Sequence, residues 1–200
     1  DSIGSKGKME PGDIQWMKTG RGIIHSEMPG MSDGKLLGFQ LWINMPSNMK
    51  MNKPKYEYIK SNQKTKFEDQ DKKINLIAGK FENVEGPVKG HNVEPIYFDI
   101  ELNESKKINL IVPETHNSFI YLLKGNLRIG SKNHEKISDS TLVLLEKGSS
   151  LEIFANKESR FLFIAGKPIG EPIARGGPFV MNTKAEILQA IQDYNNGTFA

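Results

Sequence analysis

Apolar and polar residues alternate along most of the chain with a period of two, and residues common in turns interrupt the alternation at short intervals. This pattern is typical of strands with one buried face. Lys124-Gly125-Asn126 lies between two such segments and predicts a hairpin connection. Many short strands at this spacing predict an all-β sandwich or barrel. The predicted strands are residues 39–44, 74–78, 96–102, 108–112, 119–123, 127–129, 141–145, 151–154 and 160–165.

One segment near the C-terminus has a helical pattern instead. Thr183, followed three residues later by Glu186, forms a capping box, and Gly197 is a natural stop. Four apolar residues line one face of the expected helix, namely Ile187, Leu188, Ile191 and Tyr194. The sequence therefore predicts one short helix that covers an open face or edge of a sheet.

Residues 50–73 interrupt the strand pattern with eight lysines and little apolar periodicity. A solvated connection between two β units explains this stretch more simply than an arm that binds nucleic acid, because no arginine cluster accompanies the lysines. The net charge of +3 is small and spread along the chain, so it predicts no surface for polyanions.

The 200 residues leave room for one ordinary domain or two small ones, and they include no cysteine. Without cysteine the chain has no disulfide, thiolate nucleophile or iron–sulfur cluster, so a metal would need His, Asp or Glu ligands. The longest apolar stretch, Phe161–Ala165, is too short to span a bilayer, and no secretion signal is visible. We therefore expect a cytoplasmic protein, or a nuclear one if the source is eukaryotic.

Four histidines are candidates for acid–base or metal chemistry: His25, His91, His116 and His134. If residues 22–28 form a strand, His25 and Glu27 project from the same face and can bind one ion. Taken alone, this spacing favours an ordinary surface or core pair over a metal site. The surrounding sequence is needed to choose between them.

That surrounding sequence resembles the pirin family of cupin proteins. Residues 11–29 contain a Pro-Gly-Asp turn and the pattern W-M-x-x-G-x-G-I-x-H-S-E, and the strand-like Phe39–Asn44 follows. The resemblance returns at residues 165–172 and 177–183 and covers nearly the whole chain in order. It implies an all-β bicupin, which has two cupin barrels, with a short C-terminal α-helix.

The resemblance also implies a domain division. Residues 1–58 would be the remainder of an N-terminal metal-site cupin, 59–66 a lysine-rich linker, and 67–200 a C-terminal cupin with the helix. The chain starts at Asp1 without an initiator methionine, so we expect the N-terminal barrel to be incomplete and to lack its first strands.

In the family, three His and one Glu hold a single iron, and His25 and Glu27 match the third His and the Glu. The other two ligands form a His-x-His motif, which this chain does not contain, so they are expected upstream of residue 1. One His and one Glu should bind Fe(II), or another divalent transition metal, only weakly. The second barrel of the family has no metal.

Other residues near these motifs have open interpretations. Met17 and Met28 flank the candidate site and either line its pocket or fill the core. Gln40 and Trp42 share a face that points either into the cavity or toward the second barrel. His116 is expected to be a hydrogen-bonded turn residue, and His91 and His134 are expected to be solvated.

The function implied by the resemblance is an iron-dependent dioxygenase of the quercetin 2,3-dioxygenase type, acting on a flavonol and dioxygen. His25 would hold the iron, and Glu27 would accept the proton of the flavonol 3-hydroxyl. This activity belongs to the intact protein, and the chain as given is expected to be inactive or to depend on a partner. The alternatives are a metal-sensing regulator that binds a transcription factor or metabolic enzyme, and a fragment with no function of its own. The sequence has no DNA-reading motif.

Overall fold

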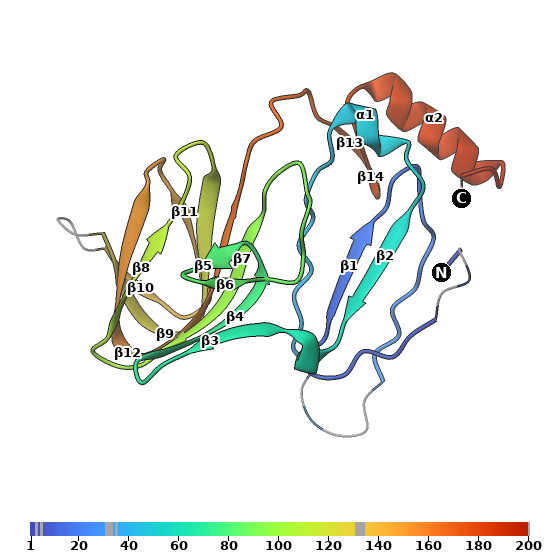
Figure 1. Ribbon diagram of the computed structural model, residues 1–200. Coiled ribbons are helices and arrows are strands. Elements are labelled where there is room, and N and C mark those ends of the chain that lie inside the picture. The colour runs from blue at the N-terminus through green and yellow to red at the C-terminus, as the bar shows by residue number, and fades with distance from the viewer. Residues whose placement is uncertain (3, 5, 31–33, 35, 131–134, 200) are drawn as a thin grey trace. The chain divides into compact units, whose positions relative to one another are not determined.

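The structure is a computed structural model that describes residues 1–200 except 3, 5, 31–33, 35, 131–134 and 200. It is mostly β, with one longer helix near the C-terminus (Figure 1). The elements are β1 (Ile14–Lys18), α1 (Ser47–Lys50), β2 (Lys55–Ile59), the 3-10 helix η1 (Ser61–Gln63), β3 (Thr65–Glu68), β4 (Lys72–Ala78), β5 (Lys80–Phe81), β6 (Val84–Glu85), β7 (Ile96–Leu102), β8 (Lys107–Ile111), β9 (Asn117–Ile129), β10 (Glu135–Ser138), β11 (Thr141–Leu145), β12 (Ser150–Gly166), β13 (Ala174–Gly176), β14 (Phe179–Met181) and α2 (Lys184–Asn195).

The described residues form two compact units. The first, which we call the split unit, contains residues 1–10, 15–58 and 169–200. The second, the barrel unit, contains residues 11–14 and 59–168. The split unit thus combines both ends of the chain, including α2. The division into domains expected from the sequence stays a prediction.

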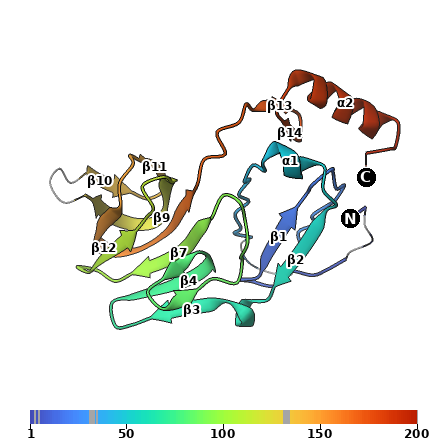
Figure 2. The same cartoon turned by 45° about the horizontal axis from the view of Figure 1, so that its top comes forward.

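The barrel unit is built on one eight-stranded antiparallel sheet that curls around its own core (Figure 2). The strand order is β10-β9-β12-β7-β4-β3, with β11 on β9 and β8 on β12. The long strands β9 and β12 each pair with three other strands, so they belong to both sides of the curled sheet.

The period-two patterns of the barrel unit have the predicted orientation. On β7, Phe98, Ile100 and Leu102 are buried, and on β8, Ile108 and Leu110 are buried while Ile111 is exposed. Each large apolar side chain that is fully removed from water contributes about 1.5–3 kcal/mol to folding. Inward-facing residues of several strands meet in one cluster, so the hydrophobic core stabilises this unit as a whole.

The hairpin predicted at Lys124-Gly125-Asn126 is wrong, because β9 runs straight through these residues. Lys124 pairs with Arg160 and Asn126 with Lys157, and the register shifts between these pairs. Gly125 has φ +114°, and a Cβ atom there would lie 2.2 Å from Ser159 Oγ. A glycine inside a strand often marks such a bulge or close approach, and its sequence signal is the same as that of a turn. The segments 151–154 and 160–165 are likewise parts of one strand, β12.

The split unit has little regular structure. Its described residues form a two-stranded sheet of β1 and β2, the β13–β14 hairpin, and the helices α1 and α2. The strand predicted at 39–44 is not formed, and neither is the one considered for 22–28. An alternating segment becomes a strand only when a neighbour accepts and donates its backbone hydrogen bonds, and no described residue pairs with these two segments.

The predicted helix is confirmed as α2, with Thr183 as its N-cap. The Thr183 hydroxyl accepts a hydrogen bond from the Glu186 amide at 3.2 Å, and the Glu186 carboxylate accepts one from the Thr183 amide at 2.7 Å. Ile187 is buried and α2 packs against β13 and β14. The rest of the predicted apolar face, however, is exposed.

The lysine-rich stretch predicted to be a solvated connection is largely structured. It contains β2, η1, β3 and the beginning of β4, and Lys50 at its start is buried. The segment therefore contains two complete strands and the first two residues of a third.

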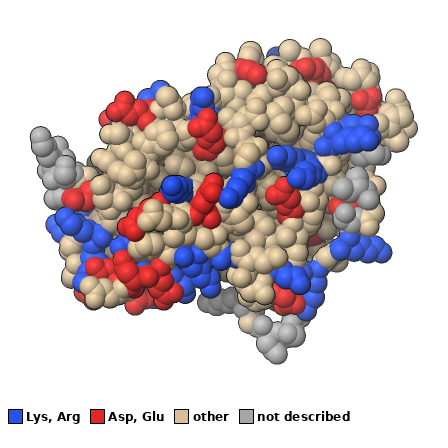
Figure 3. All heavy atoms as spheres, in the orientation of Figure 1, with Lys and Arg blue, Asp and Glu red and all other residues tan. Residues whose placement is uncertain are grey.

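The predicted all-β fold with one short C-terminal helix is confirmed. Acidic and basic side chains are interspersed on the face shown in Figure 3. No helix within the described part of the chain is long and apolar enough to cross a membrane.

Candidate metal site

The Pro-Gly-Asp turn before β1 has a structural role. Gly12 has φ +86°, a conformation that glycine adopts without strain. The Asp13 carboxylate accepts a hydrogen bond of 2.7 Å from the Ser61 amide at the start of η1. The turn therefore fixes the point from which β1 and the following motif residues run.

His25 and Glu27 lie in the irregular segment after β1, and the structure brings them together as predicted. His25 Nε2 is 3.9 Å from Glu27 Oε1, and the two side chains are 30% and 58% exposed. Ser2 holds this segment in place: its amide donates to Ile24 O at 2.7 Å, and its hydroxyl accepts from the Ile24 amide at 3.0 Å. The side chains of His25 and Glu27 therefore lie on the same side of the backbone even though the segment is not a strand.

The donor atoms of this pair suit a transition metal in kind. Imidazole nitrogen and carboxylate oxygen are common ligands of Fe(II), and their separation lets both reach one ion. Within the described residues, no group of three or more His, Asp or Glu side chains could hold a metal ion. The role of His25 and Glu27 as metal ligands stays a prediction.

The residues predicted to line the pocket have different environments. Met17 is half-buried on β1, whereas Met28 is 87% exposed and Gln40 is also exposed. Trp42 is 55% exposed, and the guanidinium of Arg175 lies 5.8 Å from the centroid of its ring. Their role as pocket lining stays a prediction.

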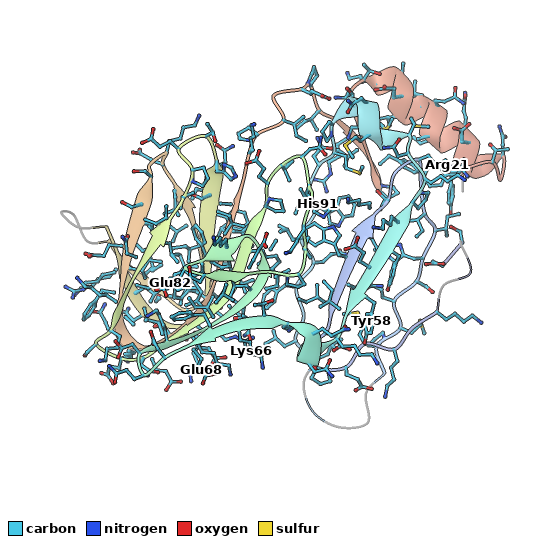
Figure 4. All side chains as sticks on the ribbon, viewed as in Figure 1. Arg21, Tyr58, Lys66, Glu68, Glu82 and His91 are labelled. Atoms are coloured by element: carbon cyan, nitrogen blue, oxygen red, sulfur yellow. The ribbon has the colours of Figure 1, made fainter. Side chains whose placement is uncertain are left out.

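The remaining histidines do not form a second site among the described residues. His116 is a buried turn residue, as predicted, with Nε2 3.0 Å from Glu94 O and Nδ1 3.3 Å from Thr115 Oγ1. His91, on the loop between β6 and β7, is half-buried rather than solvated (Figure 4). His134 lies outside the described residues.

Two charged residues that the sequence did not single out contact the segment 39–44. Lys50 donates hydrogen bonds to Asn44 and to the carbonyl of Val180, and Arg175 lies over Trp42. Their partners are up to 133 residues away along the chain, so neither periodicity nor a local motif could have found them.

Comparison with known proteins gives matches over both units. The family model described as "Pirin" matches residues 1–43, and the one described as "Pirin C-terminal cupin domain" matches residues 97–200. The curled antiparallel sheet and the second of these matches define the chain as a cupin protein.

Two relatives match almost the whole chain. Human pirin is 38% identical over 199 residues, which is 98% of this chain and 68% of the human protein. Pirin-1 of Arabidopsis thaliana is 39% identical over 200 residues, which is 98% of this chain and 69% of that protein. The chain belongs to the pirin family.

A solved structure is also similar. The crystal structure of quercetin 2,3-dioxygenase from Acinetobacter baumannii matches with a TM-score of 0.83 and 28% sequence identity. The match covers 100% of this chain and 71% of that one. The fold of the Acinetobacter enzyme is therefore shared along the full length described here.

Proposed function

We propose that this chain is part of a metal-dependent dioxygenase that opens a flavonol of the quercetin type, with His25 and Glu27 as two ligands of a divalent metal, Fe(II) in the first instance. The observation that carries the proposal is the 3.9 Å approach of His25 Nε2 and Glu27 Oε1 within a segment that the pirin family model matches. The similarity to an enzyme named quercetin 2,3-dioxygenase supports the choice of substrate. Further ligands would come from outside these 200 residues.

In this proposal the two side chains have different tasks. A bound metal would supply Lewis acidity toward the vicinal oxygens of the flavonol and redox chemistry with dioxygen. His25 would hold an imidazole nitrogen toward the ion, while Ser2 fixes the backbone immediately before it. Glu27 is the more exposed of the pair, so its carboxylate can also accept the proton of the 3-hydroxyl group.

The test measures metal content and the loss of quercetin absorbance under air in the full-length protein. We expect Glu27→Gln to lower turnover about 100-fold or more, because it removes a proton acceptor as well as a ligand. Glu158→Gln, at an exposed carboxylate of the barrel unit, is the matched control and should leave turnover unchanged. Equal turnover by Glu27→Gln and the wild type would contradict the proposal.

The alternative function is a metal-sensing binding protein without catalysis. The same experiment separates the two functions, because metal-loaded full-length protein that leaves quercetin intact under air excludes the dioxygenase and leaves the binding role.

A further inference from the structure

Lys50, the last residue of α1, is a buried charged residue. Its side chain and backbone together are only 6% exposed, and lysine is rarely buried unless its ammonium group is paired. Lys50 Nζ donates to Asn44 Oδ1 at 2.6 Å and to Val180 O at 3.1 Å. Burial lowers the pKa of Lys50, while the carboxylates of Glu171 and Glu186 act in the opposite direction. The ammonium therefore links residue 44 to β14.

A second set of polar contacts joins the same two parts of the split unit. The Ser47 amide donates to Glu171 Oε2 at 2.8 Å, and Asn182 Nδ2 donates to the same oxygen at 2.9 Å. The bond from Ser47 is the main reason that the pKa of Glu171 is lowered. Residues 44–50 are thus attached to residues 171–182 at two points.

A third contact lies at Trp42. The Arg175 guanidinium on β13 is within reach of a cation–π interaction with the indole ring. Trp42 belongs to an extended segment that pairs with no strand among the described residues. The position of Trp42 is therefore not fixed by strand pairing with any described residue.

We propose that Lys50 and Arg175 are positioning residues, through which the C-terminal segment 171–182 holds residues 42–44 for flavonol binding. This inference rests on the proposed function, and it adds that flavonol binding depends on a segment more than 120 positions further along the chain. Lys50 acts through Asn44, and Arg175 acts on Trp42 itself.

A purely structural role for Lys50 makes a different prediction. Lys50→Met keeps the stem of the side chain but leaves Asn44 Oδ1 and Val180 O without their donor, so it should lower stability whatever the role of Lys50. If Lys50 is only structural, the folded variant should keep the Trp42 accessibility and the ligand affinity of the parent.

The first arm of the test measures Trp42 without any ligand. The chain has two tryptophans, so Trp16→Phe leaves Trp42 as the one fluorophore of this kind. In that background, we expect Lys50→Met and Arg175→Met to raise the acrylamide quenching constant of Trp42 about twofold and to shift its emission. Lys184→Met and Arg21→Met change exposed cations of the same unit and are the controls (Arg21 in Figure 4).

The second arm titrates the metal-loaded full-length protein with quercetin under nitrogen by calorimetry. We expect Lys50→Met to weaken binding about tenfold, because hydrogen bonds to a charged group are lost, and Arg175→Met about threefold. Lys50→Arg, which restores a cation, should recover part of the affinity.

The outcomes separate the two proposals. Quenching constants equal to those of the controls overturn the positioning role, and so does an unchanged quercetin affinity in variants whose Trp42 has become accessible. A wild-type protein that does not bind quercetin overturns the proposed function and, with it, the role of residues 42–44 in flavonol binding. In that case the quenching arm still decides whether Lys50 and Arg175 hold Trp42.

Discussion

In the barrel unit, large side chains such as Phe161, Phe163 and Ile120 are completely removed from water. In the split unit, Ile187 is the one described apolar side chain that is buried, and it is still 8% exposed, while Leu36, Leu37 and many others are exposed. The buried residues of the split unit include a charged one, Lys50. The two units therefore differ in what stabilises them: a hydrophobic core in one, and caps, ion–amide contacts and ring contacts in the other.

The contrast extends to the backbone. Eight strands of the barrel unit share one continuous sheet, whereas the described residues of the split unit pair only two by two. An element held by few buried contacts opens more easily than one in a core. The candidate metal site lies in the less constrained unit, where single polar contacts have more influence on geometry. The predictions below test this difference, beginning with the largest expected effect.

Phe163→Ala should destabilise the barrel unit most. Phe163 is fully buried and its ring centroid lies 6.2 Å from that of Phe98, so truncation leaves a cavity in the core. We expect a loss of about 3–5 kcal/mol, measured by urea denaturation with hydrogen exchange at β7, β9 and β12. Leu144→Ala, at a side chain 78% exposed, is the control and should change stability by less than about 0.5 kcal/mol. Equal losses for the two variants would remove the distinction between core and surface in this unit.

Gly125→Ala should have the next largest effect. The added methyl group meets Ser159 Oγ and adjacent backbone atoms at a positive φ, so β9 and β12 must move apart at the bulge. We expect a loss of about 1–3 kcal/mol in the same denaturation experiment. Gly148→Ala has no atom within 4 Å of the new Cβ and serves as the control. An unaffected Gly125→Ala variant would show that the bulge relaxes freely.

Thr183→Ala tests the split unit. The substitution removes the side chain that caps α2, and we expect about 1 kcal/mol of local destabilisation. Hydrogen exchange should accelerate in α2 and leave the β9 and β12 amides unchanged. Thr183→Ser keeps the cap and should behave like the parent. Faster exchange throughout both units would mean that their stabilities are coupled.

The smallest effect concerns pH. Hydrogen bonds from the Thr183 hydroxyl and amide lower the pKa of Glu186 below its ordinary value of 4.5. The stabilisation from this carboxylate is therefore fully present above pH 4.5 and is lost as the pH falls through the lower pKa of the folded state. Urea titrations followed at 222 nm should show this loss, and Glu186→Gln should show a shallower pH dependence. The same slope in both proteins would assign the acid sensitivity to another group.

The sequence predicts the barrel unit well because a half-buried strand alternates apolar and polar residues, and this alternation is visible within the segment itself. The alternation at 96–102 gives both the strand and the orientation of its side chains. The prediction fails at 124–126, where a bulge and a turn have the same local pattern, and at 39–44, where a strand would need a partner that the alternation does not reveal.

Some residues of the candidate site could likewise be predicted from local spacing, and others could not. The spacing of His25 and Glu27 in an extended chain already places both side chains on one side, which their 3.9 Å separation confirms. Lys50 stands among many other lysines, and only the fold distinguishes it by burying it against Asn44 and β14. Contacts between distant segments are properties of the folded chain, so they could not be predicted from local patterns.

The order of segments along the chain has a consequence for biosynthesis. The split unit takes residues from before and after the barrel unit, with 110 residues, 59–168, between its two main parts. On the ribosome, all strands of the barrel unit are made before β13, β14 and α2 exist. Lys50 can therefore reach its acceptor on β14 only after translation has passed Val180. A pause late in translation would leave the barrel unit able to fold while the contacts of Lys50 with β14 and of Arg175 with Trp42 were still unformed.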